Sequence, residues 1–329
     1  MQVIRRAGGR FGPPQTLVTD AGGGTTGRLV ALSDGRMLAV IAAPQRLWVS
    51  SARGAGRFGV VRGLTPNGSA PAALSVTGTP DGGSALVWTQ GAGGNVFGAS
   101  AGPGQTPARR HTLLTAAAGH AIDEVQLVSG PAGLTVVFTD SFNDAAGNYH
   151  SQVMAGDLTA MSKPLRPRAL SAADVVASQL AMAGDGNGDE VATWEVCSNS
   201  SQTCGLQSRS RRAPVSPAPR PGARKRGRRA RRVAPPWFGP ASSLGQIDAG
   251  ESPQLAMAGG GQALLGWITG GRVAIAAMPH GAGRFGAVRH GLSGGLAGNL
   301  ALGFGPSGEA VAAWTQGTFA PDVFASRAG

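Results

Sequence analysis

The side chains that could bind a polar ligand or transfer a proton are few and are spread along the chain. A candidate set occurs just before or after short apolar segments: His120, Asp140, Asn143, Asp144, Glu195, Asp248 and Glu251. Two carboxyl groups brought together can act as acid and base on a glycosidic bond. Acidic residues scattered over a surface cannot do this, and the spacing of the acids in this sequence favours a scattered arrangement. We therefore expect a ligand-binding face and no catalytic residue.

The two cysteines of the chain, Cys197 and Cys204, are separated by six polar residues. They lie at the end of one expected strand and the start of the next, so a hairpin would bring them opposite each other. A disulfide across so short a loop is worth about 2–3 kcal/mol. It would also indicate an oxidising compartment. Two free thiols are the alternative; a zinc site would need further cysteines or nearby histidines, which are missing.

A third group of polar residues alternates with glycine: Asp185, Asn187 and Asp189. Oxygen ligands at this spacing can bind calcium, although the distal glutamate of a full calcium loop is missing. The same residue types are typical of a hairpin turn. Asp34-Gly35 and Asp81-Gly82 occupy the equivalent place in other repeats, so the turn is favoured. Calcium is the one cofactor that the sequence leaves open.

The net charge of +12 comes almost entirely from one segment. Eleven basic residues and no acid fall between Arg209 and Arg232, and the rest of the chain is close to neutral. We expect residues 208–235 to be a disordered, Pro- and Arg-rich insertion. Its basic cluster could bind a polyanion such as nucleic acid, teichoic acid or anionic lipid. That cluster consists of Arg224, Lys225, Arg226, Arg228, Arg229, Arg231 and Arg232.

These residues are set in a repeat of about 47 residues that occurs six times. One landmark is a Gly-Arg-Phe-Gly turn, seen around Phe11, Phe58 and Phe285 and in altered form at Phe238. The other is a short apolar run that ends in a large side chain, and these side chains are Ile41, Trp88, Phe138, Trp194, Trp267 and Trp314. A repeat of 40 to 50 residues is typical of propeller blades, which bury their apolar faces only against each other.

Each repeat predicts four short antiparallel strands. The first strands are expected near 27–32, 72–77, 123–128, 178–183, 253–258 and 298–303, and the second strands end at the six large side chains. The third strands are expected near 46–51, 95–100, 148–154, 204–209, 272–277 and 322–327. Fourth strands follow at 60–64, 110–114, 164–170, 240–244 and 287–292. The sequence therefore predicts one all-β domain over residues 1–329, a six-bladed β-propeller.

The last blade lacks a fourth strand of its own, and Pro13–Val18 is expected to supply it. That strand would protect the open edge of the last blade. Residues 2–6 resemble a further third strand, since Gln-Val-Ile-Arg-Arg-Ala-Gly at the start compares with Val-Phe-Ala-Ser-Arg-Ala-Gly near the end. Residues 2–6 are therefore either a terminal tail or part of a repeat within which Met1 falls, and the sequence leaves both open.

With these repeats laid out, the chain resembles bacterial secreted β-propeller repeat proteins of the actinobacterial type. Residues 8–14, Gly-Gly-Arg-Phe-Gly-Pro-Pro, and 310–314, Ala-Val-Ala-Ala-Trp, carry the resemblance best. It implies the propeller fold and an exported location, and no activity. Sialidase-like propellers use a tyrosine nucleophile with an arginine cluster, but the one tyrosine here, Tyr149, lacks that setting, and the Asp-box motif is absent.

We therefore expect an exported, monomeric binding or scaffold module whose partner is a protein or a glycan. The alternatives are a propeller-fold carbohydrate-active enzyme, sialidase-like or lyase-like, and a polyanion binder that uses the arginine-rich loop. A secreted or cell-envelope location is expected although no signal peptide is visible. A membrane span is not expected, since no run of 18 apolar residues occurs.

Overall fold

The structure is a computed structural model that describes residues 15–19, 24–54, 56–197, 203–213, 237–305, 308–317 and 322–328. These parts of the chain contain β-strands and turns and no helix. They accordingly include no helix that could span a membrane.

The strands form six antiparallel units that follow the repeat. Their first strands are β1 (Thr26–Ala31), β5 (Pro71–Gly78), β9 (His120–Gly130), β13 (Val176–Gly184), β17 (Gln254–Met257) and β20 (Ala297–Phe304). Their second strands are β2 (Arg36–Ala43), β6 (Ser84–Gln90), β10 (Gly133–Asn143), β14 (Glu190–Cys197), β18 (Ala263–Thr269) and β21 (Ala310–Gln316). Their third strands are β3 (Arg46–Arg53), β7 (Asn95–Ala101), β11 (Tyr149–Leu158), β15 (Thr203–Arg211), β19 (Arg272–Met278) and β22 (Asp322–Ala328).

The fourth strands are shorter and less regular. They are β4 (Arg62–Gly63), β8 (His111–Leu114), β12 (Arg168–Ala169) and β16 (Ser242–Asp248). In the fifth unit only the bridge between Ile275 and Arg289 stands where a fourth strand was expected. The third and fourth units are joined into one sheet by a single parallel pair, Ser151 and Val176.

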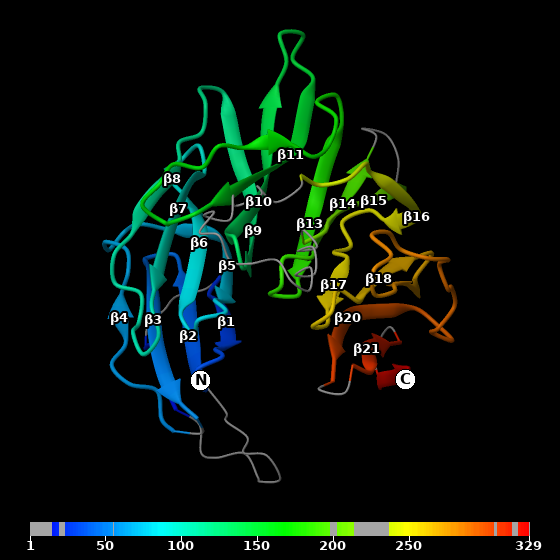
Figure 1. Cartoon of the computed structure of the whole chain (residues 1–329). Helices are drawn as coiled ribbons and strands as arrows, with labels where there is room; N and C mark the ends of the chain where they lie inside the picture. Colours follow the sequence, from blue (N-terminus) through cyan, green and yellow to red (C-terminus); the bar gives the residue numbers. More distant parts are fainter. Residues whose placement is uncertain are drawn as a thin grey trace, which may run out of the picture.

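The units lie side by side in an arc, in the order of the chain (Figure 1). Successive first strands contact each other from β1 through β5, β9, β13 and β17 to β20. Among the described residues, β20 and β1 do not pack against each other in the way that these successive strands do. The arrangement is propeller-like, and Figure 1 shows an opening between the first and last units.

The core lies between neighbouring units. Trp88, Trp194 and Trp267 are fully buried, Phe138 is 1% exposed, and Trp314 is 6% exposed. The second strands β6 and β18 are buried along nearly their whole length, because both of their faces pack against other units. The prediction that the large residues of the repeat form this core is confirmed at these five positions, whereas Ile41 of the first unit is only partly buried.

The N-terminal segment does not form the strand pair that the sequence predicted. The side-chain amide of Gln15 exchanges two hydrogen bonds of 2.9 Å with the backbone of Phe58. Leu17 packs on Phe58, Ala39 and Ala52 of the first unit. Among the described residues β22 has only β21 as a partner. The contact between Leu17 and Phe58 thus places residues 15–19 on the first unit and not on the last one. Pro13 and Pro14 of the predicted strand lie outside the described residues.

The basic insertion begins later than the sequence predicted. Strand β15 runs to Arg211, and both Ser208 and Arg211 are buried, so residues 208–211 belong to the fourth unit. Arg211 is held there by the buried Glu190 and by Asp157, and the distribution of charge along the sequence does not reveal these contacts. The cluster Arg224–Arg232 lies outside the described residues, so its disorder and its binding of a polyanion stay predictions.

Candidate functional site

The β10–β11 hairpin is built from two of the longest strands, and it protrudes at the top of Figure 1. Phe142 stands in register between His120 on β9 and His150 on β11. Its ring centroid lies 4.8 Å from that of His120, in a stacked arrangement, and 5.5 Å from that of His150. The register of three strands therefore produces a short row of flat rings on one face of the hairpin.

Each histidine of this row has an aspartate partner. Nδ1 of His120 lies 3.0 Å from Oδ1 of Asp140, and Nε2 of His150 lies 3.1 Å from Oδ2 of Asp144. Asp144 also closes the hairpin loop, because it accepts the backbone N–H groups of Ala146 and Asn148. The hydrogen bond from the Asn148 side chain is the main cause that holds the pKa of Asp144 well below its usual range, and the hydrogen bond with His150 is the next.

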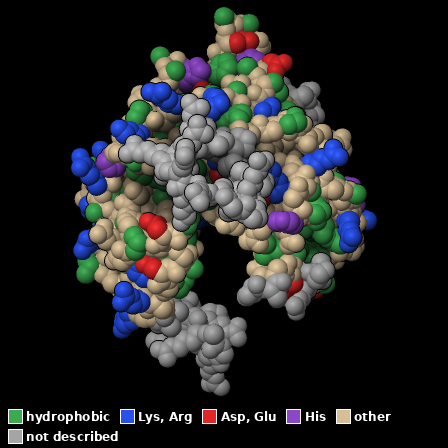
Figure 2. Space-filling model, in the orientation of Figure 1, with side chains coloured by type: hydrophobic (Ala, Val, Ile, Leu, Met, Phe, Trp, Pro, Cys, Tyr) green, Lys and Arg blue, Asp and Glu red, His purple; other side chains and the backbone are tan. Residues whose placement is uncertain are grey.

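We define the hairpin cluster as His120, Asp140, Phe142, Asp144 and His150. Histidine and acidic side chains are seen together at the top of Figure 2, at the end of the hairpin. Among the described residues neither histidine is hydrogen-bonded to a serine, threonine or cysteine, so they form no nucleophile-activating triad. The hairpin cluster offers rings that are stacked on one another and held in place, with hydrogen-bonding groups beside them. Asn143 and Tyr149 pair across the hairpin next to it and are exposed.

The other predicted residues of this face join units to one another. Glu195 is 1% exposed and accepts hydrogen bonds from Ser178 Oγ (2.9 Å) and the Gly250 N–H (3.2 Å). Asp248 accepts the N–H groups of Gly270 (2.8 Å) and Gly271 (2.9 Å). These two carboxylates thus hold the turns between the fourth and fifth units, and Glu251 is half-buried beside them.

One carboxyl group at this face was not predicted. Glu124 on β9 accepts the N–H groups of Gln179 (3.0 Å) and Leu180 (2.9 Å), where β13 is irregular and Gln179 has a φ of 54°. Burial raises its pKa against these hydrogen bonds, and the nearby charges of Asp123 and Glu195 raise it further. The sequence signal was weak, since Glu124 stands directly beside Asp123 in an ordinary strand.

The predicted disulfide is present and joins Cys197 at the end of β14 to Cys204 in β15. The one group of described side chains close enough to hold a metal ion is formed by these two cysteines and Glu195. Because both sulfur atoms are bonded to each other, they are not available as thiolate ligands.

The Asp185 loop is formed as a hairpin turn. Oδ1 of Asp185 accepts the N–H groups of Asn187 (2.7 Å) and Asp189 (3.1 Å). Asp189 in turn pairs with Arg212 at 2.5 Å and accepts the Ala213 N–H. These bonds match the turn interpretation, and calcium binding at this loop stays a prediction.

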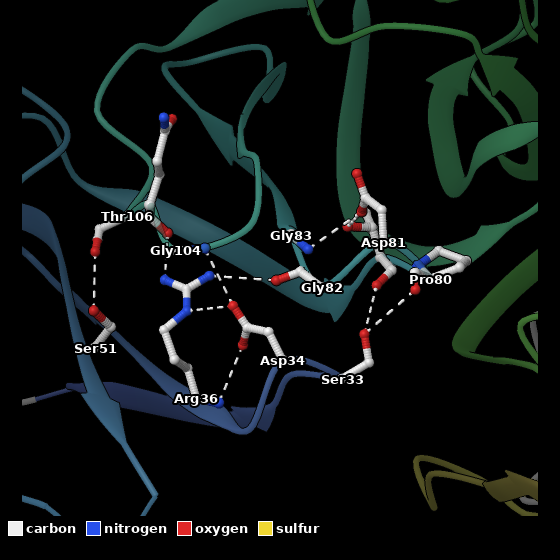
Figure 3. A network of polar contacts seen from close by, with 12 residues as sticks. Ser33, Asp34, Arg36, Ser51, Pro80, Asp81, Gly82, Gly83, Gly104 and Thr106 are labelled. Carbon is white, nitrogen blue, oxygen red and sulfur yellow. Dashed lines mark hydrogen bonds and ion pairs between the residues drawn. The ribbon is translucent and has the colours of Figure 1, made fainter.

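Two arginines join neighbouring units on the face opposite the hairpin cluster. Arg36 projects from the first unit, pairs with Asp34 at 2.7 Å, and donates to the carbonyl groups of Gln105 (2.6 Å) and Gly82 (3.3 Å) of the second unit (Figure 3). Asp34 completes the link by accepting the Gly104 N–H. The side chain of Arg36 is buried, so this network fixes the two units to each other.

The second arginine, Arg211, joins the fourth unit to the third. It pairs with Glu190 at 2.6 Å and with Asp157 at 2.7 Å, and it also donates to Thr135. Glu190 and Arg211 are 2% and 5% exposed. Burial raises the pKa of Glu190, although Arg211 acts in the opposite direction. This ion network lines a cavity of about 400 Å³ between the two units.

No protein-family model and no curated protein sequence matches the chain. Solved structures do. A protein of unknown function from Dyadobacter fermentans has 10% sequence identity and a TM-score of 0.50, with 92% of this chain and 93% of that chain covered. The α-L-arabinanase of Penicillium chrysogenum, complexed with arabinobiose, has 11% identity and a TM-score of 0.51, with 92% of each chain covered. At such identities the likeness shows the fold alone, which is all-β and propeller-like.

Proposed function

We propose that this protein is an exported, six-bladed β-propeller that binds a glycan and does not cleave it. The disulfide supports export, because such bonds persist in oxidising compartments. The repeat supports six blades, since each unit of the structure corresponds to one copy of it.

The hairpin cluster is the observation that carries the binding role. Phe142 stacks between the two imidazoles, so a sugar can contact the ring of His120, whose side chain is 30% exposed, and Asp140 and Asp144 stand beside this row as acceptors. The aspartates fix both rings before any ligand arrives, so little conformational entropy is lost on binding.

Retention on insoluble polysaccharides tests this role. We expect the protein to be retained on at least one of cellulose, chitin, arabinan and xylan, and His120→Ala to weaken that retention at least tenfold. His290→Ala is the matched control, because His290 is an exposed histidine in another unit. Retention on none of the four, or equal retention of both variants, would contradict the proposal.

A carbohydrate-active enzyme is the second candidate, and Glu124 is the observation that favours it. A carboxyl group with a raised pKa beside two other acids is the setting of a general acid. Both oxygens of Glu124 already accept backbone N–H groups, which explains the residue as a link between β9 and β13. Release of soluble sugars that Glu124→Gln abolishes would decide for the enzyme.

A further inference from the structure

The last unit of the arc exposes apolar side chains at positions that the repeat buries in other units. Val311 in β21 is 37% exposed, and Val323 in β22 is 76% exposed. The strand registers give Val323 the same place in its repeat as Leu47 in the first unit and Val273 in the fifth. Both of these side chains are 0% exposed, because each packs on the unit that follows it. Val323 therefore lies on an interface surface that no following unit covers within the described part of the chain.

The first unit exposes the other side of the same interface. Strand β1 is exposed along nearly its whole length, and Leu29 in it is 50% exposed. Leu29 corresponds to Val76 in β5, which packs against the first unit. Ile41 is only partly buried, whereas Trp88 at the same place in the second unit is 0% exposed. The side of the first unit that faces away from the second is thus only partly covered.

These two surfaces match because they are the two sides of an interface that recurs between successive units. Each pair of neighbouring units encloses a hydrophobic cluster, from the first pair to the last. We define the leading face as Leu29, Ile41 and Trp48 of the first unit, and the trailing face as Val311, Ala313, Val323 and Ala325 of the last unit. Exposed apolar patches of this kind mark sites where another protein surface binds.

The two faces of one chain do not meet. Leu29 and Val323 are both exposed, and in the described parts of the chain β1 and β20 do not pack on each other. Figure 1 shows the opening between them. Closing it within one chain would require the interfaces between units to shift, and these are close-packed and linked by buried groups such as Arg36. A second copy can reach either face without such a change.

We propose that the leading face of one copy of this chain packs on the trailing face of a second copy, so that the row of units continues from copy to copy. Val323 is then buried by the next copy, as Val273 is buried by the last unit. Because the two faces differ, every assembly keeps one free face of each kind, and further copies add in line. The sequence alone led us to expect a monomer, and this proposal departs from that expectation. It does not depend on glycan binding.

Sedimentation velocity over a hundredfold range of protein concentration tests the proposal. We expect the wild type to form dimers and larger species as its concentration rises. Val323→Asp and Leu29→Asp should each weaken association at least tenfold, because each places an unpaired charge in the contact. Both side chains are exposed, so neither change should disturb the fold of the single copy. Val60→Asp is the matched control, since Val60 is 80% exposed but borders the second unit.

A mixture of the two variants tests whether unlike faces join. Val323→Asp keeps an intact leading face, and Leu29→Asp keeps an intact trailing face. The mixture should therefore form a dimer and nothing larger, although each variant alone stays monomeric. A wild type that stays monomeric over the whole range, association that survives in both variants, an equal loss in Val60→Asp, or a mixture that stays monomeric would each overturn the proposal. His120→Ala should associate like the wild type, which separates this contact from the hairpin cluster.

Discussion

Replacing Arg211 by methionine should be among the most damaging single changes in this protein. The substitution keeps much of the aliphatic side chain but removes the charge that faces Glu190, 2% exposed, and Asp157. Breaking a buried ion pair from one side costs about 3–5 kcal/mol, because it leaves a buried charge without a partner. We expect a loss of that size in the free energy of unfolding, measured in guanidinium chloride at pH 7.

The double variant Arg211→Met with Glu190→Gln isolates the cause. Glutamine removes the buried negative charge, so the double variant should recover about 2 kcal/mol of what the single variant loses. Arg272→Met is the control for the arginine itself, since Arg272 is exposed and its loss should cost less than about 0.5 kcal/mol.

The pH dependence gives an independent check. Without Arg211 the pKa of Glu190, already raised by burial, should rise further, because the group that opposes this shift is gone. A raised pKa in the folded state means that stability increases as the pH falls through it. The deficit of Arg211→Met should therefore be largest at neutral pH and shrink toward pH 5. A deficit under 1 kcal/mol, or one shared fully by the double variant, would refute this account of the network.

Three further outcomes are expected. Without reductant, alkylation should leave the mass of the exported protein unchanged, because both cysteines are in the disulfide. The double variant Cys197→Ser with Cys204→Ser should lose about 2–3 kcal/mol in the free energy of unfolding, by the loop-entropy estimate. Two alkylated thiols in the native protein would show that the bond does not form. Deleting residues 1–20 should lower the free energy of unfolding by about 2–4 kcal/mol, because the packing of Leu17 and the two Gln15 hydrogen bonds are lost. Deleting residues 1–6 should have a mild effect. Equal melting temperatures of the two truncated proteins would disprove a structural role for residues 15–19. Removing calcium with a chelator should leave the melting temperature unchanged if the Asp185 loop is a plain turn, and a drop of several degrees would show a bound ion.

The repeat made most of the strands predictable. The third strand of the second repeat was expected near 95–100 and is β7 (Asn95–Ala101), and the first strand of the third repeat was expected near 123–128 and is β9 (His120–Gly130). Alternation, turn residues and the large side chain of each repeat are local signals, so position along the chain is enough to read them. The outer strands were predicted less well, because β4 and β12 make only two residue pairs each and depend on what the neighbouring unit offers.

The polar networks could not be predicted in the same way. Arg211 contacts Asp157 and Thr135, which are 54 and 76 residues away, and nothing in the sequence marks them as partners. Arg211 also stands at the head of a run of arginines and was read as part of it. Phe142 was likewise missed, since only the register of three strands places it between two histidines.

The most direct test of the central claim is to measure binding and cleavage on one sample. Wild-type protein is incubated for a day with the polysaccharide that retains it among cellulose, chitin, arabinan and xylan, and the soluble fraction is analysed by mass spectrometry. We predict that the protein is bound, that His120→Ala is not, and that no oligosaccharides are released. Release of oligosaccharides by the wild type, abolished in Glu124→Gln, would contradict the claim that this propeller-like protein binds glycans without cleaving them.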